Sequence, residues 1–244
     1  MYNTHEPTVN KPEFVTVGGG RHNESIEASF HRIMEGASWK NQRVVVIMPA
    51  AYDIPTKVAL SHWALVFPPN QPNYKILALG QEVGDAYNNA IEQVLAQPEL
   101  SQWEYILTIE HDNTPPPDGV VQLIKQMDAH PEYSCIGGLY WTKGEGGVPQ
   151  IWGDPKDPIL NFRPQPPVPG ELVECCGTGM GFNLWRMSMF KTLPKPWFVT
   201  KCDKEGMGTQ DLTFWQEARK HGHRCAIDCS VLVGHYDKAT GINW

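Results

Sequence analysis

Three short apolar segments, each followed by a helical pattern, constrain the fold of this chain more than any other feature. The strand-like segments are residues 43–48, 73–79 and 105–109. The helical patterns that follow them are residues 52–67, 85–95 and 118–127. Strands that alternate with helices in this way are typical of parallel sheets covered by helices. The order therefore predicts an α/β fold of the Rossmann-like kind, a single domain with a mostly parallel central sheet flanked by helices.

The second half of the chain continues the pattern less regularly. We expect further strands at residues 134–140, 173–176 and 224–233, and helices at residues 184–193 and 209–221. Prolines and glycines fill residues 144–170, which predicts a long irregular segment. The first 40 residues carry little periodic apolar signal beyond a short helical pattern at residues 26–34. The sequence thus predicts an N-terminal arm over residues 1–40 and a domain over residues 41–244.

Composition narrows the class of protein. The chain has 244 residues, 41% of them hydrophobic and 19% charged, which suits an ordinary globular protein. It contains neither a run of eighteen apolar residues nor an apolar N-terminal segment, so we expect neither a transmembrane helix nor a secretory signal. The adjacent Cys175 and Cys176 favour reduced thiols in the cytoplasm, or in a host's cytoplasm for a viral protein. A net charge of −7 gives no general attraction to nucleic acid.

An acidic triplet follows the third strand-like segment. Glu110, His111 and Asp112 come directly after residues 105–109, and a proline-rich stretch soon ends the segment. In open α/β sheets, ligands bind at the carboxyl ends of the strands. Two carboxylates there make a site for Mg²⁺ or Mn²⁺ that carries a phosphorylated ligand. The alternative is that the two acids only cap the turn after the strand.

Two residues near the C-terminus are candidates for chemistry. Asp211 lies at the start of the predicted helix 209–221, where a carboxylate suits a general base for a hydroxyl group, although it is equally suited to capping the helix. His235 follows the last predicted strand, and a neutral imidazole is a good Mn²⁺ ligand beside carboxylates. A lone histidine is more often structural, so both interpretations stay open for each residue.

In its order of motifs the chain resembles the GT-A glycosyltransferases of the inverting family 2 type, from about Val44 to His235. The triplet Glu110-His111-Asp112 stands where that family has Asp-x-Asp, and Gln210-Asp211 matches its Glu-Asp motif. The resemblance implies that Asp112 and His235 bind the metal ion and that Asp211 is the catalytic base. Glu110 would reach the ribose or a metal-bound water.

The resemblance also implies a set of nucleotide-sugar contacts, in which Tyr87 replaces an arginine that the family often has. Trp141, Trp152 and Trp185 are candidates for stacking on a sugar or base, or for core packing. The implied nucleotide-sugar-binding residues are Pro49, Ala50, Asp53, Asn88, Glu110, His111, Asp112, Gly138 and Gly179.

The implied function is transfer of a sugar from a nucleoside-diphosphate sugar to an acceptor hydroxyl, with inversion and with Mn²⁺ or Mg²⁺ as cofactor. The acceptor is unknown, and a hydroxymethylated base in viral DNA or a glycan are both open. A nucleotidyltransferase is one alternative, although it predicts a glycine- and arginine-rich loop after the first strand, where this chain has Pro49-Ala50-Ala51-Tyr52. A noncatalytic nucleotide- or glycan-binding module is the other.

Overall fold

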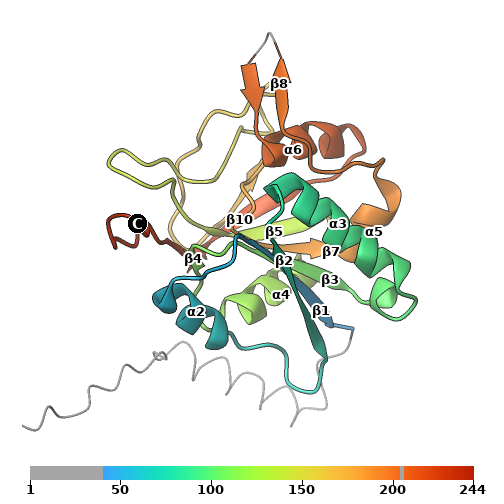
Figure 1. Ribbon diagram of the computed structural model, residues 1–244. Helices are drawn as coiled ribbons and strands as arrows, with labels where there is room; N and C mark the ends of the chain where they lie inside the picture. Colours follow the sequence, from blue (N-terminus) through green and yellow to red (C-terminus); the bar gives the residue numbers. More distant parts are fainter. Residues whose placement is uncertain (1–40, 204–205) are drawn as a thin grey trace, which may run out of the picture.

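The computed structural model describes residues 41–203 and 206–244 (Figure 1). The predicted arm at residues 1–40, with its helical pattern at residues 26–34, lies outside the described residues. The helices are α2 (Thr56–Trp63), α3 (Val83–Ala96), the short 3₁₀ helix η1 (Leu100–Gln102), α4 (Gly119–Ala129), α5 (Met187–Thr192) and α6 (Gln210–Lys220). The strands are β1 (Val44–Ala50), β2 (Asn73–Leu79), β3 (Tyr105–Ile109), β4 (Asn113–Thr114), β5 (Cys135–Leu139), β6 (Leu172–Cys175), β7 (Phe182–Arg186), β8 (Lys201–Asp203), β9 (Gly206–Gly208), β10 (Cys225–Leu232) and β11 (Gly234–His235).

Seven strands form the central sheet in the order β2-β1-β3-β7-β5-β10-β6. Strand β1 pairs in parallel with β2 and β3, and β5 pairs in parallel with β10. Strand β7 runs antiparallel between β3 and β5, and β6 is antiparallel at one edge. Five of the seven strands therefore point the same way, so the predicted mostly parallel sheet flanked by helices is confirmed.

Helices cover both faces of this sheet (Figure 1). The side chains of β1 show how the two faces are separated: Val45 and Ile47 belong to one buried cluster, whereas Val44, Val46 and Met48 belong to the other. The first cluster includes residues of α3, α5 and α6, and the second includes residues of α4. This alternation is that of a strand buried on both faces, as the apolar run of β1 predicts.

Strand β7 is the main difference from the predicted elements. The sequence predicts one helix over residues 184–193, but the chain forms β7 and then the short helix α5 over Met187–Thr192. Because β7 lies in the middle of the sheet and is buried on both faces, its residues lack the alternation of apolar and polar positions that marks a half-buried strand. A short segment of mixed apolar and polar residues such as this one does not distinguish a buried strand from a buried helix.

An aromatic cluster fills the core between the sheet and α6. Trp185 of β7 is fully buried and stacks on Trp215, with ring centroids 5.4 Å apart. Its indole N–H donates to the Thr108 hydroxyl oxygen at 2.9 Å. The suggestion that Trp185 stacks on a ligand is therefore wrong, because the ring has no face left for one.

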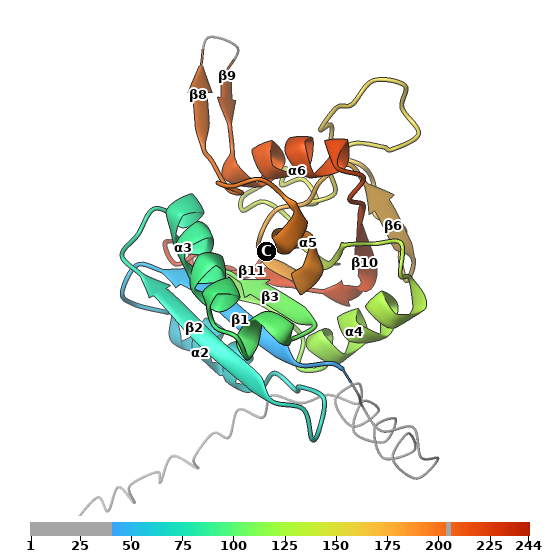
Figure 2. The same cartoon turned by 90° about the vertical axis from the view of Figure 1, so that its right-hand side faces the viewer.

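Two features extend beyond the layers. The β8–β9 hairpin projects away from the sheet, past the start of α6 (Figure 2). The C-terminal strand β11 pairs antiparallel with β4, so His235 lies opposite Asn113. Across the described part of the chain, every helix is too short or too polar to cross a lipid bilayer.

Candidate active site

The acidic triplet lies where the sheet ends between β3 and β7. The backbone N–H of Glu110 donates to the carbonyl of Gly181 at 3.1 Å, so Glu110 continues the ladder of β3 by one residue. Successive side chains of a strand alternate between the two faces, which places Glu110 on the same face as Thr108. Thr108 binds Trp185 in the cluster below α6. Glu110 therefore faces the side of the sheet that carries α6 and Asp211.

Asp112 is held by two basic side chains. Its Oδ2 atom lies 2.5 Å from the Lys143 ammonium nitrogen and 3.6 Å from Nε2 of His235. Burial alone would raise the pKa of Asp112, but the hydrogen bonds and charges of His235 and Lys143 outweigh it and hold that pKa well below its usual range. Asp112 is therefore a carboxylate at any physiological pH, as a cation ligand must be.

His235 is fixed by the loop that follows β5 and by the end of the chain. Its Nδ1 lies 2.8 Å from the carbonyl oxygen of Trp141. Its backbone exchanges two hydrogen bonds with Trp244, at 2.9 and 3.1 Å, and the next N–H, that of Tyr236, donates to the Asp112 carbonyl at 2.7 Å. The C-terminal segment thus binds the backbone of the acidic triplet and places the imidazole beside the carboxylate.

Glu110 and Asp211 form the second half of the cluster. Burial, and then the charges of Asp112 and Asp211, raise the pKa of Glu110 to about 8. Burial likewise raises the pKa of Asp211. Thr209 is the N-cap of α6, and Asp211 lies in the first turn, where one carboxylate oxygen accepts the N–H of Leu212 at 2.8 Å. Asp211 is thus not the capping residue.

A cavity of about 490 Å³ opens beside the triplet. This is within the range of small-molecule sites, on the order of 300–1,000 Å³. Five of the predicted nucleotide-sugar-binding residues line it. The lining residues are Pro49, Ala50, Ala51, Tyr52, Gly80, Gln81, Val83, Glu110, His111 and Asp112.

The other predicted contact residues are placed differently. Asp53 follows the lining residue Tyr52, is exposed, and forms an ion pair with Lys238 of the C-terminal segment. The side-chain amide of Asn88 binds the protein backbone. Its oxygen accepts the N–H groups of Trp197 and Phe198, and its nitrogen donates to the carbonyl oxygen of Phe198.

The two glycines of the predicted contact set face protein atoms. A Cβ at Gly138 would lie 2.7 Å from Val233, and one at Gly179 would lie 2.4 Å from the Tyr140 hydroxyl oxygen. Packing explains why both positions are glycine. Contact of Asn88, Gly138 and Gly179 with a sugar-nucleotide donor stays a prediction.

The cluster offers ligands for a divalent cation. Within residues 41–203 and 206–244, histidine, cysteine, aspartate and glutamate form no group of three that could hold a metal ion. Asp112 and His235 nevertheless supply one oxygen and one nitrogen 3.6 Å apart, with the other ring nitrogen bound to a carbonyl. A metal-binding histidine usually has this second hydrogen bond. The pair fits a cation that takes its remaining ligands from a diphosphate and water.

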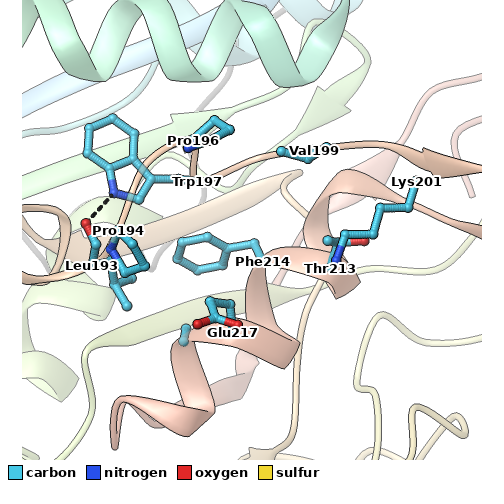
Figure 3. Close-up of a pocket in the computed structure, with 10 residues that line it drawn as sticks. Leu193, Pro194, Pro196, Trp197, Val199, Lys201, Thr213, Phe214 and Glu217 are labelled. Atoms are coloured by element: carbon cyan, nitrogen blue, oxygen red, sulfur yellow. Dashed lines mark hydrogen bonds between the residues drawn. The ribbon is translucent and has the colours of Figure 1, made fainter.

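A second cavity, of about 110 Å³, lies between α6 and residues 193–201 (Figure 3). Thr213, Phe214 and Glu217 line it from the helix, and the Trp197 indole N–H donates to the Leu193 carbonyl at its rim, at 3.3 Å. Its lining includes none of Glu110, Asp112, Asp211 and His235, so this cavity is separate from the acidic cluster.

The structure brings three further side chains to this site, none of them among the predicted contact residues. Lys143 comes from the loop after β5, and Tyr140 accepts the backbone N–H of Gly181 at 2.8 Å. The Tyr87 ring is fully buried, and this burial, followed by the charge of Glu110 and smaller contributions that include Asp112, raises the pKa of its phenol. The replacement of a family arginine by Tyr87 is the one sequence signal that marks this position.

Comparison with known proteins supports the fold. No protein-family model matches the sequence, and neither does any curated protein. Among solved structures, A197 from STIV is similar over 80% of this chain and 86% of its own, with 14% identity and a TM-score of 0.58. S. aureus TarS 1–349, alone and in complex with UDP-GlcNAc, gives TM-scores of 0.46 and 0.47 at 14% and 15% identity. Each match covers 76% of this chain, which spans 57% and 55% of the TarS chains. The described chain is a single α/β domain with a mostly parallel sheet flanked by helices, and its fold is similar to that of A197 from STIV.

Proposed function

We propose that this protein is a metal-dependent glycosyltransferase that moves a sugar from a nucleoside-diphosphate sugar to an acceptor hydroxyl with inversion. The observation that carries the proposal is the convergence of Asp112, His235, Glu110 and Asp211 beside the cavity at the carboxyl end of β3. Ligand sites of α/β sheets lie at this end of the strands. The resemblance of the motif order to GT-A glycosyltransferases, with Glu110-His111-Asp112 and Gln210-Asp211 in the matching places, supports the same class of donor.

Each residue has a role that follows from its surroundings. Asp112 and His235 would hold Mn²⁺ or Mg²⁺, which when bound supplies positive charge against the diphosphate leaving group. Glu110, with a pKa of about 8, is mostly protonated at pH 7, so its carboxyl group donates a hydrogen bond to a hydroxyl group of the sugar nucleotide. Asp211, whose pKa is raised by burial, accepts the proton of the acceptor hydroxyl as that oxygen attacks the anomeric carbon.

The acceptor belongs to the same proposal. A glycan and a hydroxymethylated base in DNA both offer the primary or secondary hydroxyl that Asp211 would deprotonate. Incubating the protein with hydroxymethylcytosine DNA or with free glycans, together with a donor panel, separates these acceptors by mass spectrometry of the products. A hexose-sized mass gain on the nucleosides identifies DNA as the acceptor.

The proposal is tested first with donors alone. UDP-, GDP-, ADP-, CDP- and TDP-sugars are titrated against the protein with Mn²⁺ and with EDTA, and slow release of nucleoside diphosphate is followed. We expect one donor class to bind and hydrolyse, with release lost in EDTA and in Asp112→Ala. Asp157→Ala is the matched control, because Asp157 is an exposed loop acid outside the cavity lining. A nucleotidyltransferase would instead release pyrophosphate from a nucleoside triphosphate.

A noncatalytic binding module is distinguished by one variant. It would bind donor without turnover, and Asp211→Asn would leave its only activity unchanged. Donor binding without product formation for any acceptor, together with indifference to Asp211→Asn, would contradict the glycosyltransferase proposal.

A further inference from the structure

The Lys143 ammonium group is paired with the carboxylate of Asp112, which a metal ion at this site would need as a ligand. Its ammonium nitrogen lies 2.5 Å from Oδ2 of Asp112, the same oxygen that faces Nε2 of His235 at 3.6 Å. We propose that Lys143 is a diphosphate-binding residue that competes with the metal ion for Asp112: without ligand it neutralises the carboxylate, and with donor bound it contacts the phosphate oxygens. This inference rests on the proposed nucleoside-diphosphate donor.

The competition follows from the geometry. A cation held by Asp112 and His235 must approach Oδ2 to about 2.0–2.2 Å, which is the position that the ammonium group of Lys143 now takes. Two positive charges at this spacing repel each other strongly in a partly buried site. A metal ion bound at Asp112 would therefore leave no place there for the Lys143 ammonium group, which the flexible lysine stem would let move to a nearby anion.

The loop that carries Lys143 is held in place. The Thr142 N–H donates to the carbonyl of Val148 at 2.9 Å, and the Val148 N–H donates to the Thr142 hydroxyl oxygen at the same distance. A Cβ at Gly147 would lie 2.3 Å from the Thr142 carbonyl oxygen, so the loop closes this tightly only with glycine there. Lys143 is thus presented at the cluster by a closed loop, while 33% of its side chain stays exposed to solvent and to ligands.

The same loop positions the imidazole. The carbonyl of Trp141, two residues before Lys143, accepts from Nδ1 of His235. One short segment therefore sets both the nitrogen that faces the metal position and the ammonium group that faces the diphosphate.

Charge balance requires such a cation. Glu110, Asp112 and Asp211 lie close together, and a nucleoside diphosphate adds further negative charge. Lys143 is the cation in direct contact with this group, through Asp112. The nearby Lys238 is instead paired with Asp53.

Two titrations of the same variants test the proposal. The first measures nucleoside-diphosphate binding in EDTA by calorimetry, and the second measures Mn²⁺ binding without nucleotide from the electron paramagnetic resonance signal of free Mn²⁺. In Lys143→Met we expect nucleotide binding in EDTA to weaken by roughly tenfold to a hundredfold, the range of a charged hydrogen bond. Mn²⁺ binding should become tighter, because its competitor is gone. Lys191→Met, at an exposed position of α5, changes the net charge equally and should alter neither.

Opposite changes in the two titrations are the result that only competition produces. Weaker binding of both nucleotide and Mn²⁺ would indicate a structural role for Lys143. Unchanged binding of both would show that Lys143 has no role in either. Each outcome overturns the proposal. Lys143→Arg keeps the charge and should retain nucleotide binding in EDTA. Wild-type binding that needs Mn²⁺ and ignores Lys143→Met would overturn the inference and leave the glycosyltransferase standing. Failure of every nucleotide to bind, with Mn²⁺ present, would overturn the proposed function itself.

Discussion

His235 donates its Nδ1 proton to the carbonyl oxygen of Trp141 across 2.8 Å, and this hydrogen bond decides which ring nitrogen faces Asp112. A carbonyl oxygen can only accept, so Nδ1 must carry a proton. In the neutral imidazole the lone pair is then on Nε2, the atom 3.6 Å from the carboxylate. The tautomer that a metal ion needs is thus set by the backbone of the loop after β5.

Replacing this imidazole should weaken metal binding. We expect His235→Ala to raise the Kd for Mn²⁺ by at least about tenfold, since changes around a metal-binding histidine cost on the order of 10–100-fold. The measurement is a Mn²⁺ titration followed by calorimetry. His223→Ala is the control, because His223 binds the Ser134 hydroxyl at the far end of β5. Equal affinities in the two variants would contradict a metal-binding role for His235.

Asp211→Asn should abolish transfer while it leaves donor binding intact. The amide cannot accept the acceptor's proton, and general-base catalysis contributes on the order of 10²–10⁴ in rate. Initial rates with a saturating donor and acceptor measure the effect on kcat, and calorimetry measures donor affinity. Glu217→Gln changes an exposed acid of the same helix, which pairs with Lys220 and His221, and should leave both values as in the wild type. A variant that loses donor affinity and keeps kcat would place Asp211 in donor binding instead.

The sequence pattern predicted the first half of the sheet well because β1 and β3 are buried on both faces and the more exposed β2 alternates. Strands β1, β2 and β3 are continuous or alternating apolar runs that end at proline, glycine or acids, and period and length suffice to identify them. Strand β7 could not be separated from α5 on these grounds, because polar residues interrupt Phe182–Arg186 and the helix after it alike and mark no boundary between them. Only pairing with β3 and β5, which is long-range information, makes it a strand.

The acids of the candidate site and His235 could be singled out from the sequence, and Lys143 could not. Asp112 follows a strand, and Asp211 begins a helix, so each has a local signature. Lys143 lies in a glycine-rich loop whose path depends on hydrogen bonds to Val148, and nothing near it in the sequence points to Asp112, 31 residues away. Trp185 shows the reverse case, because an aromatic that suits ligand stacking proves to be core.

Stability should depend on the protonation of Glu110. Its pKa is about 8, raised from 4.5, so the folded state binds this proton more tightly than the unfolded state does. The resulting stability is fully present below pH 4.5 and is lost as the pH rises through about 8. We expect Glu110→Gln, which stays neutral, to gain Tm relative to the wild type as the pH rises from 5 to 9. A change of 1 kcal/mol corresponds to roughly 2–4 °C for a chain of this size.

The difference between the two melting curves isolates this one group. Glu92→Gln is the control, because Glu92 is an exposed residue of α3 paired with Lys195. Its Tm should follow that of the wild type at every pH. A Tm difference between Glu110→Gln and the wild type that stays constant from pH 5 to pH 9 would show that Glu110 titrates normally.

Loss of the hydroxyl group should change the free energy of unfolding in opposite directions at two buried tyrosines beside the acids, Tyr87 and Tyr140. The Tyr87 hydroxyl is buried and has no hydrogen-bond partner among the described residues, and such a group costs about 1–3 kcal/mol. Tyr87→Phe should therefore leave the free energy of unfolding unchanged or raise it by up to that amount. Tyr140→Phe should lower it, because the Gly181 N–H then loses its acceptor at 2.8 Å. Urea unfolding of both variants measures the two signs, and a similar loss of stability in both would show that the Tyr87 hydroxyl is hydrogen-bonded in solution.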